Sequence, residues 1–142
     1  MQQIIIVLAL LFSAVLFGQN SENSSLKNHT LEVSVANVLN NKGTVNFAVY
    51  NKENFLKKPL LAKKAEIENG KSTVIFNELP NGIYAVVCYH DENENGRLDF
   101  YENGMPIESY GSSNNVMNYG PPDFDSAKFE IGNNNVVLEI KF

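Results

Sequence analysis

The sequence lacks a second cysteine, a dense group of basic residues and any long stretch with helical periodicity. Because Cys88 is the only cysteine among the 142 residues, no intramolecular disulfide can form, and stability must come from a hydrophobic core or a bound metal. The formal net charge is -5, whereas neutralising nucleic-acid phosphates requires grouped Lys and Arg. We therefore expect no nucleic acid among the partners. The one lysine group surrounds Pro59 and is interpreted as a solvated edge: Lys57, Lys58, Lys63 and Lys64.

Charge is also absent from the beginning of the chain. Ile4 to Phe17 is apolar except for Ser13, which is the length of a signal-peptide core and too short to span a bilayer comfortably. A membrane anchor or a buried strand are the alternatives, and the missing Lys and Arg before this run weaken the assignment to a signal peptide. We expect a signal peptide at 1–19, a flexible leader at 20–30 and one domain at 31–142. No cysteine marks a lipid anchor, so the predicted location is periplasmic or secreted, without a membrane span after cleavage.

Without helical periodicity, the remaining pattern is alternation of apolar and polar residues in short runs separated by turn residues. This pattern predicts an all-β fold, a single antiparallel β-sandwich of about seven strands. The expected strands are Leu31–Asn37, Thr44–Tyr50, Ala62–Glu68, Ser72–Phe76, Ile83–His90, Lys128–Ile131 and Val136–Phe142. Apolar residues on both faces of the fifth run indicate a central strand.

The turn residues between these runs predict three hairpins. They join the first two strands, the third and fourth through Asn69-Gly70, and the last two through Gly132-Asn133-Asn134. The 51–61 connection contains Pro59 and room for one helical turn. The 104–126 segment is long and polar, so it is either a functional loop or contains an element that the pattern misses.

The most specific motif follows the predicted central strand. From Asp91 to Glu102, oxygen-bearing side chains occupy positions 1, 3, 5, 9 and 12, and a glycine occupies position 6, which is the spacing of a twelve-residue calcium loop. Five residues would supply side-chain oxygens and Arg97 its backbone carbonyl. The predicted ligands to structural Ca²⁺ are Asp91, Asn93, Asn95, Arg97, Asp99 and Glu102.

The surroundings of this motif differ from those of an EF-hand. An EF-hand loop is flanked by two helices, whereas this one follows a strand and precedes Gly104-Met105-Pro106. An acidic turn without metal is the alternative interpretation, since Asp, Asn and Gly favour any tight connection. Two neutral ligand positions predict a Kd of about 0.1 mM, as in extracellular modules. At about 1 mM calcium such binding contributes roughly 1.4 kcal/mol, which suits a structural ion better than a switch.

The sequence contains only incomplete sets of residues for a zinc site or a hydrolase active site. Cys88 and His90 lie two residues apart on a strand, but a second imidazole near them is missing, so a buried thiol is favoured over a zinc site. A hydrolase could draw its carboxylates from Asp91 or Glu108 beside the 104–125 loop. A pocket joining these carboxylates to Tyr110 would favour it. Because no complete catalytic set is present, we expect that the protein is not an enzyme.

Three segments together resemble a known family. They are Leu79-Pro80-Asn81-Gly82-Ile83-Tyr84-Ala85, the loop from His90 to Asp99, and the run Gly104-Met105-Pro106-Ile107-Glu108-Ser109-Tyr110-Gly111. This combination resembles a family of exported bacterial proteins that is catalogued as a domain of unknown function. The first segment is also similar to transthyretin-like (prealbumin-like) and carboxypeptidase-regulatory-like β-sandwiches. The resemblance implies export and a sandwich fold and brings no established activity.

These observations lead to two functional hypotheses. The first is a calcium-stabilised β-sandwich that acts as a binding or accessory module at the bacterial cell envelope, with an unidentified protein, small molecule or glycan as its ligand. The second is an envelope hydrolase that uses the carboxylates beside the 104–125 loop.

Overall fold

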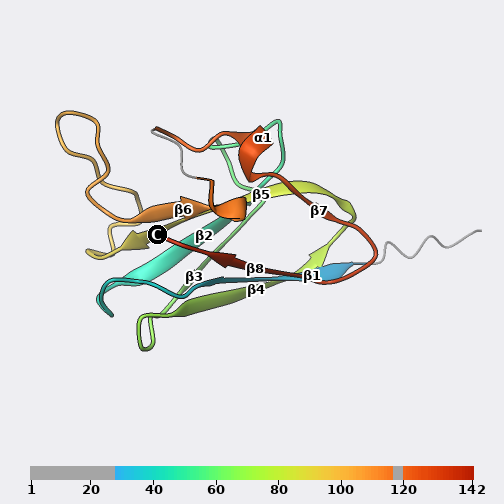
Figure 1. The fold of residues 1–142 in the computed structure, drawn as a ribbon, viewed down its shortest axis with the longest axis horizontal. Coiled ribbons are helices and arrows are strands. Elements are labelled where there is room, and N and C mark those ends of the chain that lie inside the picture. Colours follow the sequence, from blue (N-terminus) through green and yellow to red (C-terminus); the bar gives the residue numbers. More distant parts are fainter. Residues whose placement is uncertain (1–27, 117–119) are drawn as a thin grey trace, which may run out of the picture.

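The structure is a computed structural model that describes residues 28–116 and 120–142. The predicted signal peptide and most of the predicted leader lie outside the described residues. Eight strands form two facing sheets, which confirms the all-β sandwich (Figure 1). The first strand begins at His29, two residues before the expected start, so the last leader residues belong to the sandwich.

The strands and the short helices follow each other along the chain as β1 (His29–Val35), β2 (Thr44–Tyr50), β3 (Leu61–Ala65), β4 (Ser72–Leu79), β5 (Gly82–Asp91), β6 (Tyr110–Ser112), the 3-10 helix η1 (Ser113–Asn115), α1 (Phe124–Ala127), β7 (Phe129–Ile131) and β8 (Val136–Ile140). Strand β5 is the longest and lies inside its sheet, as its apolar residues on both faces predict.

The strands divide into a three-stranded sheet of order β4-β1-β8 and a five-stranded sheet of order β3-β2-β5-β6, in which β7 also pairs with β5. All pairs are antiparallel except β1 with β8, which is parallel. The prediction of a purely antiparallel sandwich is therefore wrong at this pair. The parallel pair arises because the last strand crosses to the other sheet.

All three predicted hairpins are wrong in their pairing. β1 and β2 lie in different sheets, as do β3 and β4, and β7 pairs with β5 while β8 pairs with β1. Only an isolated Glu68–Lys71 bridge remains at the predicted Asn69-Gly70 turn. The physical reason is that a strand with one apolar face can bury that face in the core from either sheet. Alternation therefore does not identify the strand with which it pairs.

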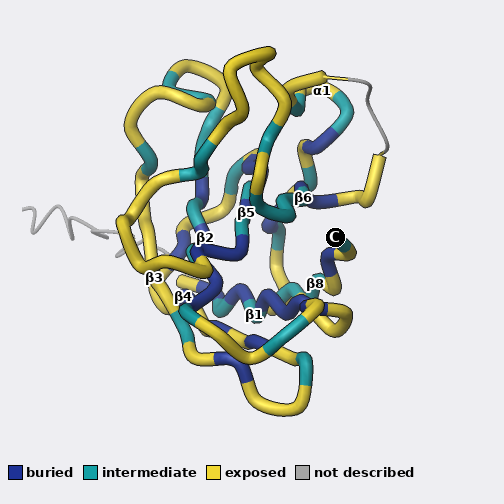
Figure 2. Tube along the Cα trace, turned by 90° about the vertical axis from the view of Figure 1, so that its left-hand side faces the viewer, coloured by how far each residue is buried: buried dark blue, intermediate teal, exposed yellow. Residues whose placement is uncertain are grey.

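The core lies between the sheets and is built from the inward-facing side chains of the strands. Phe47 on β2 and Phe76 on β4 are its largest buried side chains, and valines from β1, β2 and β5 surround them. Figure 2 shows that the strands carry most of the buried residues, whereas the connecting loops are exposed. This arrangement leaves the outward face of each sheet for other roles.

The 104–126 segment contains three elements that the sequence pattern missed: β6, η1 and α1. Each is three or four residues long, which is too short to show a period. Strand β6 places Tyr110 opposite Tyr89 on β5, and α1 begins after Asp123, whose side chain accepts a hydrogen bond from the Ser126 backbone N–H. Strand β6 therefore extends the five-stranded sheet beside β5, and α1 lies close to the same strand.

Candidate binding site on the five-stranded sheet

The outer face of the five-stranded sheet forms the floor of the candidate site. Along β2, Val45, Phe47 and Val49 face the core, so Asn46, Ala48 and Tyr50 face outward. On β5 the same alternation turns Val87 and Tyr89 outward. These outward side chains are only partly exposed, because loops from both ends of the strands pack over them.

The first of these loops is the acidic loop, Asp91–Asp99, which leaves the end of β5. Its first residue, Asp91, is 2% exposed. One carboxylate oxygen accepts the Asn95 N–H at 3.0 Å, and the other accepts the Gly96 N–H at 2.9 Å and the Asn46 amide at 3.1 Å. These bonds curl the chain around the carboxylate, as the sequence spacing predicts.

The Asn40–Gly43 turn packs against the base of the acidic loop. The carbonyl oxygen of Lys42 lies 2.7 Å from Nε2 of His90. Gly43 has a φ of +66°, and a Cβ there would lie 2.0 Å from the carbonyl oxygen of Asp91. Only glycine permits both this backbone angle and this approach. The β1–β2 connection therefore fixes where the acidic loop begins.

The far end of the acidic loop converges on Asp99. Its carboxylate accepts hydrogen bonds from the side-chain amides of Asn93 and Asn95 at 2.8 and 2.7 Å, and from Nε of Arg97 at 3.1 Å. The hydrogen bond from Asn93 is the largest cause that lowers the pKa of Asp99, and those from Asn95 and Arg97 lower it further. Donors thus surround a carboxylate that stays ionised.

After Asp99 the chain forms a hairpin, Asp99–Ile107, closed by the Ile107 N–H to Asp99 carbonyl bond and the Tyr101 N–H to Met105 carbonyl bond, both 2.8 Å. Glu102 lies in its turn, beyond the hydrogen-bonded cluster. The structure therefore brings together five predicted ligands, Asp91 to Asp99, and places Glu102 at the hairpin tip. The large apolar residues of the hairpin are more than half exposed: Phe100, Tyr101, Met105 and Ile107.

Glu108, a candidate hydrolase carboxylate and a residue of the segment that resembles the family, holds the acidic loop just before β6. One carboxylate oxygen accepts the Glu92 N–H at 3.0 Å, and the other accepts the Asp99 N–H at 3.1 Å. The two amides lie at opposite ends of the acidic loop, so one side chain fixes its width. The signal in the sequence was the Gly-x-Pro-x-Glu run, in which Pro106 pairs with Phe100 inside the hairpin and Glu108 directly follows the hairpin's last residue, Ile107.

The 51–60 segment and α1 bound the other side of the outer face. Phe55 contacts both Tyr50 on β2 and Phe124 on α1, with ring centroids 5.6 Å apart in each pair. The Leu60 N–H donates to the Val49 carbonyl at 2.8 Å, and this anchors the segment to β2. Aromatic packing therefore holds this boundary, whereas hydrogen bonds hold the acidic loop.

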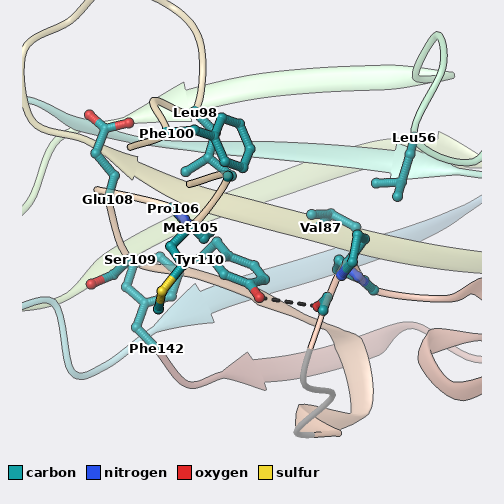
Figure 3. A pocket seen from close by; sticks show the side chains of 14 residues that line it. Leu56, Val87, Leu98, Phe100, Met105, Pro106, Glu108, Ser109, Tyr110 and Phe142 are labelled. Atoms are coloured by element: carbon teal, nitrogen blue, oxygen red, sulfur yellow. Dashed lines mark hydrogen bonds between the residues drawn. The ribbon is translucent and has the colours of Figure 1, made fainter. Parts of the chain in front are cut away.

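Between these boundaries is the cleft, a cavity of about 760 Å³. Leu98 and Phe100 lie on one side and Leu56 on the other, with Val87 on the floor (Figure 3). Met105, Phe142 and the prolines Pro121 and Pro122 complete an almost entirely apolar lining. The polar residues Glu108, Ser109 and Tyr110 also line it, but the Tyr110 hydroxyl donates to the Gly120 carbonyl at 3.2 Å and Glu108 holds the acidic loop.

The acidic loop can be tested for its fit to calcium by its donor set. Among the residues that the structure describes, no three His, Cys, Asp or Glu side chains gather closely enough to hold a metal. A site here would depend on Asp91, Asp99, the amide oxygens of Asn93 and Asn95, and the Arg97 carbonyl. The two amides now direct N–H groups at Asp99, and their oxygens accept the backbone N–H groups of Asn95 and Arg97 at 3.1 and 3.0 Å. Presenting oxygen to an ion beside Asp99 would require rotating both amides and breaking these two bonds. The hard oxygen set that remains fits calcium.

Cys88 and His90, the pair considered for zinc, face the interior. Burial raises the pKa of the Cys88 thiol, which lies 3.8 Å from the Gly111 carbonyl oxygen. His90 is engaged by Lys42. Both side chains thus have structural contacts in the sandwich, and they take no part in the outer-face cleft.

Across residues 28–116 and 120–142, no helix is long and apolar enough to span a bilayer. Neither the curated proteins nor the solved structures contain a match to this chain. A family model matches residues 33–139, which include nearly the whole sandwich, the acidic loop and Glu108. The chain belongs to the bacterial family described as "Uncharacterized protein conserved in bacteria (DUF2141)".

Proposed function

We propose that this protein is an exported binding module whose cleft receives an apolar group of its ligand, and whose acidic loop is stabilised by calcium. The observation that carries the proposal is the lining of the cleft. A volume of about 760 Å³ lies within the range of small-molecule sites. Most of its side chains are apolar, and of its three polar residues the Glu108 carboxylate and the Tyr110 hydroxyl already have partners within the protein. Burial of apolar surface is therefore the main source of affinity.

Calcium has a specific task in this proposal. The hairpin that forms one side of the cleft begins at Asp99, and Asp99 belongs to the proposed ligand set with Asp91, Asn93, Asn95 and the Arg97 carbonyl. An ion there would neutralise the acidic loop and hold the hairpin at a fixed angle to β5. Because Glu102 lies at the hairpin tip, two carboxylates remain in the set, which favours weak binding of the kind found in extracellular modules.

Export rests on the first nineteen residues. The apolar Ile4–Phe17 run and the polar residues after it support delivery to the periplasm or the medium. Extracellular calcium concentrations would suit a weak site. Fractionation of cells that express the full chain tests this part, and a full-length protein found only in the cytoplasm would contradict it.

Binding is tested with the neutral fluorescent probe N-phenyl-1-naphthylamine, titrated into the purified protein. We expect saturable binding that Phe100→Ala weakens, because this exposed ring lines the cleft. The matched control is Val137→Ala, which removes an exposed apolar side chain from the other sheet. Absence of saturable binding, or equal weakening by both substitutions, would overturn the proposal.

The calcium part has its own test. Calorimetric titration and thermal melts with calcium against chelator should give binding heat and a higher melting temperature with calcium. A protein with neither response would lack the ion, while the apolar cleft would stand on the probe titration alone.

A hydrolase is the second candidate, because the cleft does bring Glu108 and Tyr110 together. Its weakness is that both Glu108 oxygens accept backbone N–H groups, and that Asp91 is buried outside the cleft. Hydrolysis of p-nitrophenyl acetate that disappears in Glu108→Gln, with folding intact, would favour this candidate over a binding module.

A further inference from the structure

A second hollow adjoins the cleft on the same outer face. Its volume is about 460 Å³, and Val87 belongs to the lining of both. Its floor includes the small side chains Ala48 and Ala62, and its polar lining residues are Asn46, Tyr50, Lys63, Lys64 and Tyr89. The cleft and this hollow together form the trough.

The registers of the strands show how the trough runs. Lys64 pairs with Asn46, Asn46 with Tyr89, and Tyr89 with Tyr110, so these four residues form one row across β3, β2, β5 and β6. The neighbouring outward row consists of Ala62, Ala48, Val87 and Ser112. Three strand spacings give the trough a length of about 14 Å. The row of small residues leaves room for a narrow, extended ligand lying across the strands.

The two ends of the trough differ in charge. At the β3 end, Lys64 stands in the four-lysine group with Lys57, Lys58 and Lys63. In the described part of the chain, none of these four ammonium groups lies within salt-bridge distance of a carboxylate. The chain carries a formal net charge of -5, so this edge is a local exception. Toward β5 and β6 the trough meets the acidic loop instead.

Tyr89 lies in the middle of the floor, and the carboxylates of Asp91, Glu108 and Asp99 are the negative groups that act on it. Negative groups surround the floor on the acidic-loop side, which disfavours an anion there and favours one at Lys64.

We propose that the trough binds a single-chain anionic amphiphile, with its anionic head at Lys64 and its aliphatic chain extended across Ala48 and Val87 into the apolar cleft. This inference rests on the proposed binding function and adds the ligand's charge, shape and direction. Charge complementarity at Lys64 selects the anion, and the apolar lining at the other end selects the chain. The four-strand row sets the extended shape.

Two neighbouring lysines provide the matched control. Lys63 and Lys64 are adjacent on β3 and project to opposite faces. The ammonium of Lys63 donates to the Ile75 carbonyl on β4 and lies 5.7 Å from the Phe76 ring centroid. Lys64 faces outward in the row with Asn46. Replacing either one by glutamine removes the same charge from the same strand, and only Lys64 lies at the proposed head position.

The experiment measures displacement of N-phenyl-1-naphthylamine by dodecanoate and by 1-dodecanol, a pair with the same chain and different heads. We expect dodecanoate to bind about fivefold more tightly, the upper range for one exposed ion pair, and added salt to reduce that preference. Lys64→Gln should abolish the preference, whereas Lys63→Gln should retain it. Ala48→Leu, which fills the floor, should weaken both compounds.

The outcomes separate the two proposals. If both compounds bind equally to the native protein, or if Lys63→Gln and Lys64→Gln have the same effect, the anionic head is refuted while the apolar binding module stands. If neither compound displaces the probe and Ala48→Leu changes nothing, the trough is refuted as the binding site. If the probe itself does not bind, the proposed function fails first.

Discussion

The two sheets of this sandwich share one core, and their outer faces are used differently. On the three-stranded sheet the outward residues Ile75 and Val137 are 47% and 71% exposed. On the five-stranded sheet, Tyr50, Val87 and Tyr89 occupy equivalent outward positions and are only partly exposed. The difference comes from the loops, because the 51–60 segment and the acidic loop with its hairpin pack over only the second face.

This comparison separates stability from binding within one fold. The core of a sandwich is formed by its inward residues, so outward residues can form a site, anchor a loop or face solvent. On the five-stranded sheet the loops are held by buried or partly buried polar groups, chiefly Asp91 and Glu108. We therefore expect polar substitutions on that face to be costly, and matched substitutions on the three-stranded sheet to be nearly neutral.

The largest expected effect is that of Asp91→Ala. The substitution leaves two backbone N–H groups and the Asn46 amide without their acceptor in a buried place, which should lower the free energy of unfolding by about 3 kcal/mol. Urea denaturation measures it. Glu32→Ala, on the outer face of β1, is the control and should stay within about 0.5 kcal/mol. Similar losses for the two variants would abolish the contrast between the faces.

Glu108→Gln should have a smaller effect. A glutamine has one carbonyl oxygen, so it can replace only one of the two bonds to the Glu92 and Asp99 amides. We expect a loss of about 1 kcal/mol and faster hydrogen exchange at these two amides.

The control for Glu108→Gln is Glu139→Gln on β8, which removes the same charge from an exposed position. Unchanged exchange at the Glu92 and Asp99 amides in Glu108→Gln would show that the acidic loop keeps its shape without this carboxylate.

The long strands and the clustered residues of the acidic loop could be predicted from the sequence, because both depend on local patterns. Alternation identified all the long strands, and the spacing from Asp91 to Asp99 identified the residues that cluster. Both patterns act within about ten residues. The ends of the elements were less well predicted: β3 ends at Ala65, three residues before the expected Glu68, and β4 continues to Leu79, three residues beyond the expected Phe76.

The pairing of strands and the location of the cleft could not be predicted, since both depend on distant residues. Whether β2 pairs with β1 or faces it across the core is decided by the whole sandwich. Glu108 acts on two amides that lie nine and sixteen residues earlier, and its role appears only when β6 is placed beside β5. Glu102 shows the reverse case: the twelve-residue spacing selected it, and the hairpin moves it away from the cluster.

The calcium proposal predicts that one double substitution has opposite effects in chelator and in calcium, which a turn without a metal site would not show. Asn93→Asp with Asn95→Asp replaces two donors to Asp99 by carboxylates, so the double variant should melt at a lower temperature in chelator because of repulsion. With calcium, the two added ligand charges should tighten binding by about tenfold. The control pair Asn133→Asp and Asn134→Asp adds the same charge at the exposed turn before β8.

A double variant at Asn93 and Asn95 that is destabilised equally with and without calcium would refute the metal site. It would leave the hydrogen-bonded acidic loop as a purely structural feature. The control pair should show no calcium dependence beyond that of the native protein.

The smallest expected effect is a pH dependence of stability that is confined to the outer face of the five-stranded sheet. The pKa of Asp99 is lowered from its ordinary value of 3.8 by the amides of Asn93 and Asn95 and by Arg97. The stability it contributes is therefore complete above that ordinary value and is lost as the pH falls through the lower pKa of the folded state. NMR titration should show amide shifts of the acidic loop in this acidic window, and Asp99→Asn should remove them. Shifts that persist in Asp99→Asn would have to come from another carboxylate, and the donors around Asp99 would then not explain the order of the loop.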